Sequence, residues 1–128
     1  MAYLKPPWFS RTIFNKVAMT FNFGPIETLT VAKRASKQPQ KIPVTPIEIG
    51  GVKYLVSAYG ETQWVKNVRA NPDIKLGNAN YLAAETAVDA RPPILDAYKA
   101  KVGKHVDEQF RTLPEPADHP VFALTPKG

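Results

Sequence analysis

Thirteen of the 128 residues are proline, about twice the share of roughly 5% that is usual in proteins. Proline lacks a backbone N–H and clashes with the preceding helical turn, so it breaks helices and is confined to edges and bulges in sheets. The prolines are spread from Pro6 to Pro126. They exclude a long helical bundle or coiled coil and favour short elements joined by turns. The length predicts a single domain over residues 1–128.

The composition excludes several classes of site. Hydrophobic residues make up 44% of the chain, enough to build a core. The chain has no cysteine, which excludes disulfides, Cys-ligated zinc, iron–sulfur clusters and thiol nucleophiles. Neither His105 nor His119 has a second ligand at metal-site spacing, so we expect no metal. No apolar run approaches the ~20 residues that span a bilayer, and we expect a cytoplasmic protein.

The N-terminal segment, residues 1–24, is expected to be helical. Residues 10–20 carry apolar side chains at helical spacing behind Ser10, a suitable N-cap. One interpretation packs this helix on the core. The other places it on the inner face of the membrane as a peripheral contact. The membrane-facing residues would then be Trp8, Phe9, Phe14 and Phe21, with Lys5, Arg11 and Lys16 beside them.

The middle of the chain predicts β structure. Glu27–Arg34 is rich in β-branched residues that alternate with polar ones. Val44–Ile49 and Val52–Tyr59 form the clearest hairpin, because Gly50 and Gly51 supply the positive φ of a tight turn. Pro43 and Pro46 push the first strand of this hairpin towards an edge or a bulge.

Short elements continue in the second half. Thr62–Ala70 predicts a helix that Asn71 and Pro72 end. Pro92 and Pro93 open another helix, which runs to about Val102 before Gly103. Further elements are strands at Ile74–Leu76, Tyr81–Val88 and Val121–Leu124, and helical turns around Val106 and Phe110. The order predicts an α+β fold, with antiparallel strands over residues 27–126 forming a small barrel and helices near 62–70 and 92–111.

The net charge of +6 is concentrated in one short segment. Lys33, Arg34, Lys37 and Lys41 lie within nine residues that contain no acid. The segment is either a solvated loop between strands or a binding site for an anion. A phosphate or polycarboxylate tail fits it better than nucleic acid, because the patch is short and holds no interleaved aromatic residue. We therefore expect no nucleic-acid partner.

Trp64, Asn67 and Val68 share one face of the predicted helix. An asparagine on an apolar face must find hydrogen-bond partners or cost about 1–3 kcal/mol. Either Asn67 bonds to the backbone of a neighbouring strand, or Trp64 and Asn67 border a ligand pocket. The chain holds no GxSxG, GxGxxG or P-loop motif, so serine hydrolysis and classical nucleotide binding have no support.

Three segments together resemble one family. They are LTVAKRASKQPQKIPV (Leu29–Val44), GGVKYLVSAYGETQWVKNVRANP (Gly50–Pro72) and ADHPVFAL (Ala117–Leu124). In this order they resemble the deazaflavin-dependent nitroreductase family, also called the nitroreductase/quinone reductase family of F-420-dependent oxidoreductases. The resemblance runs over about residues 5–126.

The resemblance implies a split β-barrel of the FMN-binding type. It also implies the coenzyme F-420, an 8-hydroxy-5-deazaflavin with an anionic tail, in preference to FMN, and no metal. The expected function is transfer of a hydride from reduced F-420 to a small-molecule acceptor, namely a quinone, an activated alkene or a nitro compound. The alternative is a non-enzymatic binder of F-420, or of a fatty acid or other lipid, in the same barrel. The oligomeric state stays open between monomer and homodimer.

The resemblance also assigns site residues by position. The tail would lie on Lys33, Arg34, Ala35, Ser36, Lys37 and Gln40, with Lys41 adding charge. The deazaflavin ring would lie against Ile42, Pro43, Val44 and Thr45, and against the strand end Val56, Ser57, Ala58 and Tyr59. Trp64 and Asn67 would contact the coenzyme from the helix. Tyr59 is the candidate catalytic proton donor, although Tyr54, Tyr81 and Tyr98 have the same chemistry.

The loop departs from the family pattern at four positions. The family's two loop glycines are here Lys33 and Lys37. Its loop lysine is Ala35, and its arginine after the proline is Gln40. Lysines can restore the lost charge but not the bidentate geometry of an arginine.

Overall fold

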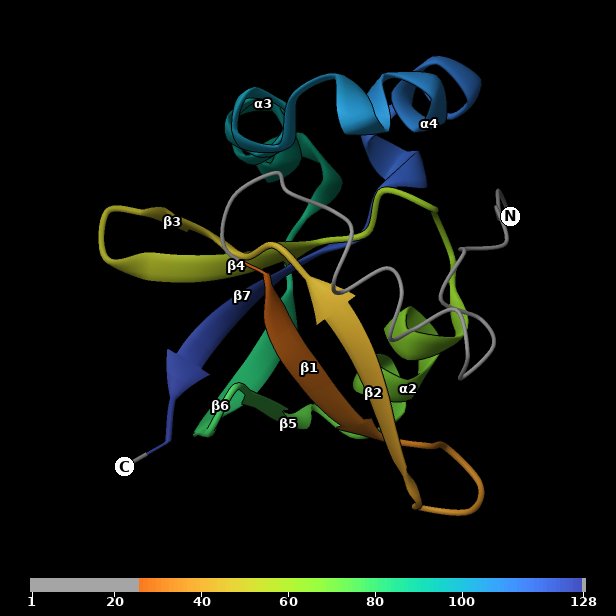
Figure 1. Cartoon of the computed structure of the whole chain (residues 1–128), viewed down its shortest axis with the longest axis vertical. Helices are drawn as coiled ribbons and strands as arrows, with labels where there is room; N and C mark the ends of the chain where they lie inside the picture. The colour runs from red at the N-terminus through yellow and green to blue at the C-terminus, as the bar shows by residue number, and fades with distance from the viewer. Residues whose placement is uncertain (1–25, 128) are drawn as a thin grey trace.

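The computed structural model describes residues 26–127 (Figure 1), so the predicted helix over residues 10–20 lies outside the described part. Its strands are β1 (Glu27–Ala32), β2 (Pro39–Val44), β3 (Ile47–Ile49), β4 (Val52–Val56), β5 (Asp73–Leu76), β6 (Ala79–Glu85) and β7 (Val121–Pro126). Its α-helices are α2 (Gln63–Ala70), α3 (Arg91–Val102) and α4 (Asp107–Thr112). Short 3-10 turns lie at Val88–Ala90, Gly103–Val106 and Pro116–Asp118.

The seven strands form one antiparallel sheet in the order β2-β1-β5-β6-β7-β4-β3. The sheet curls into a half-barrel, with α2 on one side and α3 and α4 across one end (Figure 1). The prediction of an α+β fold with antiparallel strands and flanking helices is confirmed.

Strands β4 and β7 lie between two apolar clusters, because successive side chains of a strand point to opposite faces. Leu55 of β4 and Phe122 of β7 join the first cluster, in the interior of the half-barrel, which α2 covers with Trp64. Val56 and Val121, the next residues along each strand, join the second cluster against α3. Both faces are therefore buried at these two paired positions, which accounts for the consecutive apolar residues Leu55–Val56 and Val121–Phe122.

The predicted glycine hairpin is confirmed. Ile49 pairs with Val52, and Gly50 and Gly51 have φ of +59° and +82°. Both central residues of the turn thus occupy the left-handed region that glycine tolerates best.

The strand predicted over Val44–Ile49 is wrong, because the structure divides it. β2 ends at Val44 and β3 begins at Ile47, and these two strands form opposite edges of the sheet. Pro43 suits the edge position of β2, since it cannot donate a backbone hydrogen bond to a further strand, and Pro46 lies in the connection just before β3. The basic segment is also only partly a loop, because Pro39, Gln40 and Lys41 belong to β2.

Three strands end earlier than their sequence patterns predict. β1 ends at Ala32, where the chain turns into the basic loop. β4 ends at Val56, because the Ser57 hydroxyl donates to the carbonyl oxygen of Gly60 and closes a turn. β6 ends at Glu85. The helix predicted over Thr62–Ala70 forms from Gln63, with Thr62 as its N-cap.

Candidate functional site

The loop between β1 and β2, residues 33–38, is docked on helix α2 through Arg34. The guanidinium of Arg34 donates from Nη2 to Gln63 Oε1 at 2.7 Å and from Nη1 to the Gln63 carbonyl at 3.3 Å. Nη1 also donates to Asn67 Oδ1 at 3.0 Å. These three acceptors are neutral, and no carboxylate among residues 26–127 forms an ion pair with Arg34.

Asn67 joins the loop, strand β2 and the helix. Its side chain is buried, and Oδ1 accepts from the backbone N–H of Arg34 at 3.1 Å as well as from the guanidinium. At the other end of the amide, Nδ2 donates to Gln40 Oε1 at 2.7 Å. The buried amide is therefore satisfied by a loop N–H and by two side chains, a set of partners that neither sequence interpretation specified.

Lys37 occupies a conformation suited to glycine. Its φ is 64°, in the left-handed region that disfavours residues with a Cβ. The backbone N–H donates to the Lys33 carbonyl at 3.1 Å, and Nζ donates to Asn71 Oδ1 at 3.2 Å, just after α2. A lysine thus occupies a left-handed position at which the resemblance places a family glycine.

The structure separates the four basic residues of the segment. Arg34 faces α2, whereas Lys41 follows Gln40 in β2 and therefore projects from the opposite face of that strand. Lys33, Ala35 and Ser36 are exposed on the loop, where Ser36 Oγ accepts from the Gln38 N–H at 3.2 Å. Two groups of cations result, one beside α2 and one on the outer face of the sheet.

The residues assigned to the deazaflavin ring are mostly buried. At the ends of β2 and β4, six of these residues are buried and Val44 is half-buried. The buried residues are Ile42, Pro43, Thr45, Val56, Ser57 and Ala58. Trp64 is 3% exposed, and its ring centroid lies 5.9 Å from that of Phe122 in the core of the half-barrel. The structure thus gives Trp64 a packing role.

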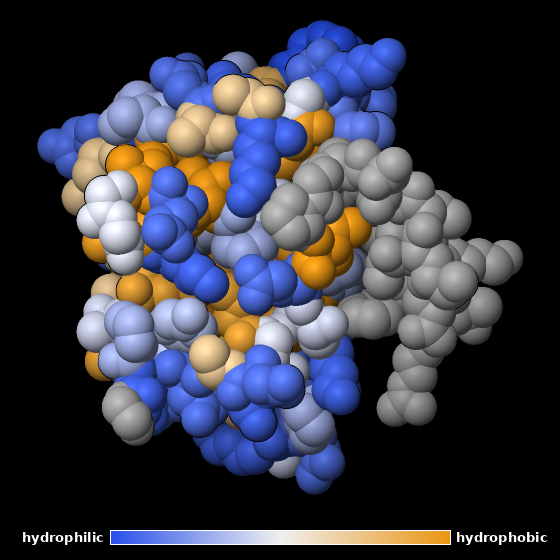
Figure 2. Space-filling view, turned by 60° about the vertical axis from the view of Figure 1, so that its left-hand side comes forward, coloured by the Kyte–Doolittle hydropathy of each residue, from blue (hydrophilic) through white to orange (hydrophobic). Residues whose placement is uncertain are grey.

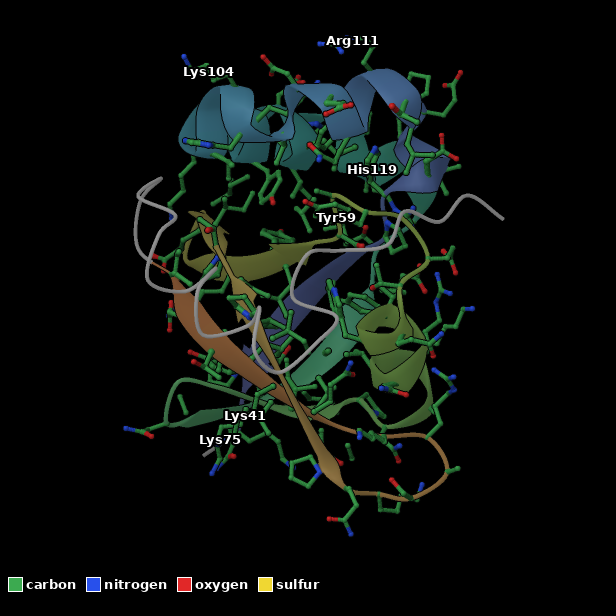
Figure 3. The ribbon with its side chains drawn as sticks, turned by 45° about the vertical axis from the view of Figure 1, so that its right-hand side comes forward. Lys41, Tyr59, Lys75, Lys104, Arg111 and His119 are labelled. Carbon is green, nitrogen blue, oxygen red and sulfur yellow. The ribbon has the colours of Figure 1, made fainter. Side chains whose placement is uncertain are left out.

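Tyr59 lies apart from the basic loop. Figure 3 shows it near α4, towards the opposite end of the molecule from Lys41. Its hydroxyl accepts from Gln109 Nε2 at 3.5 Å. Burial, with a smaller contribution from the charge of Glu108, raises the pKa of Tyr59 above its ordinary value. The phenol therefore keeps its proton at neutral pH. The other buried tyrosine of this region, Tyr98, also has a raised pKa because of burial.

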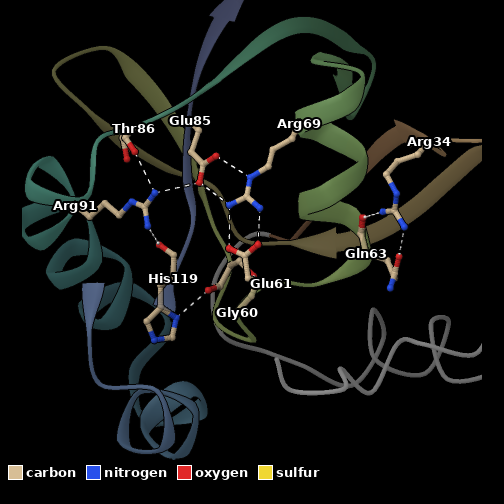
Figure 4. A network of polar contacts seen from close by, with 10 residues as sticks. Arg34, Gly60, Glu61, Gln63, Arg69, Glu85, Thr86, Arg91 and His119 are labelled. Atoms are coloured by element: carbon tan, nitrogen blue, oxygen red, sulfur yellow. Dashed lines mark hydrogen bonds and ion pairs between the residues drawn. The ribbon is translucent and has the colours of Figure 1, made fainter. Parts of the chain in front are cut away.

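A chain of ion pairs that no sequence pattern indicated runs from α2 to α3 (Figure 4). Arg69 contacts both oxygens of Glu61 and both oxygens of Glu85, with its Nε 2.8 Å from Glu85 Oε1. Arg91 Nη2 lies 3.1 Å from Glu85 Oε2. The hydrogen bond from Arg69 holds the pKa of Glu85 below its usual range. No spacing in the sequence joins these residues, because they come from four separate segments.

His119 closes this network towards the C-terminus. It is fully buried, and its ring stacks on Phe110 with centroids 4.0 Å apart. Nδ1 lies 2.9 Å from the Ser57 carbonyl, and Nε2 faces the Leu113 carbonyl. Its carbonyl oxygen accepts from buried Arg91 at 3.4 Å. We assign His119 to structural support of the turn before β7.

Residues 26–127 offer neither a cluster of metal-binding side chains nor a membrane-spanning helix. No group of three or more histidine, aspartate or glutamate side chains in this part is placed to hold a metal ion. None of its helices is both long enough and apolar enough to cross a membrane.

The curled antiparallel sheet, with helices on one side and at one end, defines a split-barrel fold. The model of the F420H(2)-dependent quinone reductase family matches residues 6–113. The protein belongs to this family. The resemblance found from the three sequence segments is thereby confirmed.

Solved structures agree on the fold. An F420-H2 dependent reductase (FDR-A) is 21% identical, with a TM-score of 0.60 over 79% of this chain and 94% of its own. A FAD-binding protein from Mesorhizobium loti is 17% identical, with a TM-score of 0.60 over 94% and 91%. A domain-swapped dimer is 19% identical, with a TM-score of 0.59 over 90% and 96%. No curated protein matched the chain.

Proposed function

We propose that this protein is an F-420-dependent reductase that holds the coenzyme's anionic tail at the β1–β2 loop. The observation that carries the proposal is Arg34, whose guanidinium is fixed against α2 by neutral acceptors only. Its positive charge is available to an anion, and the hydrogens that these three bonds leave, one on Nε and one on Nη2, can donate to phosphate or carboxylate oxygens. Lys33 and Lys37 add charge on the same loop. This donor set fits the phosphate and carboxylates of the coenzyme's tail.

Bound in reduced form, F-420 would supply a hydride, and a quinone, activated alkene or nitro compound would accept it. The chain's own task is then to hold the coenzyme and to exclude water. Two segments are proposed to lie against the deazaflavin ring. They are Ile42, Pro43, Val44 and Thr45, and the β4 end at Val56, Ser57 and Ala58. The proton that completes reduction of the acceptor would come from the Tyr59 hydroxyl, which is protonated at neutral pH.

We assign Asn67 and Gln40 a positioning role. Both ends of the Asn67 amide are already used inside the protein, on Arg34 and Gln40. Asn67 would therefore act on the coenzyme through Arg34, by fixing the position of the loop and the direction of the Arg34 side chain.

Titration of the protein with F-420, followed by the coenzyme's fluorescence at two salt concentrations, tests the proposal. We expect saturable binding that weakens with salt, because the contacts are ionic. Arg34→Gln should weaken binding about ten-fold or more, Arg34→Lys less, and Lys104→Gln, at the other end of the molecule (Figure 3), hardly at all. Absence of binding at micromolar protein would overturn the proposal.

Parallel titrations with FMN and FAD decide between coenzymes. Tighter binding of either flavin than of F-420 would replace F-420 in the proposal. Native mass spectrometry of protein purified from cells addresses the lipid binder, since a copurified lipid would support that alternative. Size-exclusion chromatography distinguishes the monomer from the homodimer.

A further inference from the structure

A row of polar and basic side chains crosses the outer face of the sheet. Thr30 of β1 pairs with Lys41 of β2 on one side and with Lys75 of β5 on the other. Lys75 pairs in turn with Asn80 of β6. Residues paired across antiparallel strands project from the same face. Lys41, Thr30, Lys75 and Asn80 therefore form one line over four strands.

Three members of this row, Thr30, Lys75 and Asn80, line a shallow open hollow of about 230 Å³. Lys41 lies beside it, paired with Thr30. The polar side chains that line the hollow are those of Thr30, Lys37, Asp73, Lys75, Asn80 and Lys127. Figure 2 shows that hydrophilic residues gather over this end of the molecule. The other lining residues are Val31, Ala32, Pro39 and Ile74, so the hollow combines polar and apolar surface.

The charge of the hollow is positive and incompletely balanced. Asp73 is its one acid, and Lys127 Nζ already pairs with it at 2.5 Å. Lys37 Nζ donates to the neutral Asn71. Neither Lys41 nor Lys75 forms an ion pair within residues 26–127, and Figure 3 shows the two near each other. The two lysines flank Thr30 on β2 and β5, with β1 between them, so their like charges repel and a bound anion would reduce this repulsion.

We propose that this hollow is a second anion-binding site, for a phosphate or carboxylate group. Lys75 holds the anion inside the hollow, Lys41 adds positive charge from beside it, and the Thr30 hydroxyl and the Asn80 amide donate to the anion. The arrangement supplies donors almost exclusively, which suits an oxyanion and disfavours a cation. The site is separate from Arg34, which faces α2, and only Lys37 belongs to both.

Inorganic phosphate is the probe, added at constant ionic strength to 15N-labelled protein while amide shifts are recorded by NMR. We expect saturable shifts at Thr30, Lys75 and Asn80. The apparent affinity should fall about five-fold or more in Lys75→Gln and further in the Lys41→Gln/Lys75→Gln double variant. Lys75→Arg should retain the shifts. Lys104→Gln removes the same charge at the far end and should leave them unchanged.

The opposite results are equally clear. Shifts that fail to saturate, or that fall as much in Lys104→Gln as in Lys75→Gln, would show general charge screening and overturn the proposal. Thermal unfolding of each variant excludes misfolding as the cause of a lost shift.

A second arm identifies the source of the anion. Complete F-420 and the tail-free deazaflavin chromophore are titrated into wild type and Lys75→Gln. A loss restricted to complete F-420 assigns the hollow to the coenzyme's tail, whereas no loss for either, with the phosphate shifts still present, assigns it to a free anion. If F-420 does not bind the wild-type protein, the proposed function is wrong. The phosphate titration then tests the anion site in the hollow by itself.

Discussion

Asn67 accepts two hydrogen bonds from the same residue, one from the backbone N–H of Arg34 at 3.1 Å and one from its guanidinium at 3.0 Å. The pair of bonds fixes both the path of the loop and the direction of its arginine. The opposite end of the Asn67 amide holds Gln40 of β2. One buried side chain therefore sets the geometry of the proposed tail site.

Replacing Asn67 by aspartate separates positioning from charge. The introduced carboxylate would still accept from Arg34, but it would neutralise the guanidinium and lose the donor to Gln40. We expect F-420 affinity to fall about ten-fold or more, whereas Asn67→Ala should mainly cost stability, about 1–3 kcal/mol, through the unsatisfied loop. Urea unfolding and fluorescence titration of both variants measure the two effects. Equal affinity of Asn67→Asp and wild type would contradict the role of Arg34.

Lys37 offers a test of backbone strain. Both Lys37→Gly and Lys37→Ala remove the bond from Nζ to Asn71, but only glycine also relieves the φ of 64°. A left-handed residue with a Cβ costs about 1–2 kcal/mol, part of which glycine's larger unfolded-state entropy offsets. We expect Lys37→Gly to be more stable than Lys37→Ala by about 1 kcal/mol in urea unfolding. A less stable glycine variant would show that this turn is not strained.

The sequence predicted what local patterns encode and missed what only the folded sheet brings together. Gly50 and Gly51, with alternating residues on both sides, specified a hairpin whose geometry the structure confirms. Val44–Ile49 looked like one strand because its residues alternate, and only the pairing of β2 with β1 and of β3 with β4 divides it.

The same limit applies to the candidate site. The helical spacing of Trp64 and Asn67 correctly predicted that both lie on one buried face. It did not predict that their partners differ. Trp64 packs on Phe122 and Asn67 binds the loop, and both partners come from distant segments. The row from Lys41 to Asn80 had no sequence signal, because it depends on the register of four strands.

Glu85 makes the stability of the fold depend on pH. Arg69 lowers its pKa below the ordinary 4.5, so the charged form stabilises the folded state above that pH. This contribution decreases as the pH falls below 4.5, and it is lost once the pH is below the lowered pKa that Glu85 has in the folded state. Glu85→Gln should cost about 1.5–3 kcal/mol at pH 7, the range for hydrogen bonds to charged groups, and less at about pH 3.

Urea unfolding of wild type and Glu85→Gln at the two pH values measures the difference. Asp96→Asn is the matched control, because its carboxylate is exposed and pairs with Lys99 at 3.7 Å on the surface of α3. Such pairs contribute about 0–1 kcal/mol. A pH-independent cost of Glu85→Gln would assign the effect to packing instead of charge.

Tyr59 is expected to act on the acceptor and not on the coenzyme. Tyr59→Phe removes the proposed proton donor and should lower kcat roughly ten-fold or more while the affinity for F-420 stays the same. Because the pKa of Tyr59 is raised above 10.0, the phenol remains protonated up to that pH. Deprotonation of Tyr59 should therefore not lower the wild-type rate below pH 10.0.

The measurement is the rate at which a quinone acceptor oxidises reduced F-420, recorded as a function of pH for both proteins. Gln109→Ala is a useful companion, since it removes the 3.5 Å contact to the hydroxyl and leaves the phenol in place. It should therefore keep most of the rate that Tyr59→Phe loses. A Tyr59→Phe variant with the wild-type rate would show that the proton reaches the acceptor from solvent or from another residue.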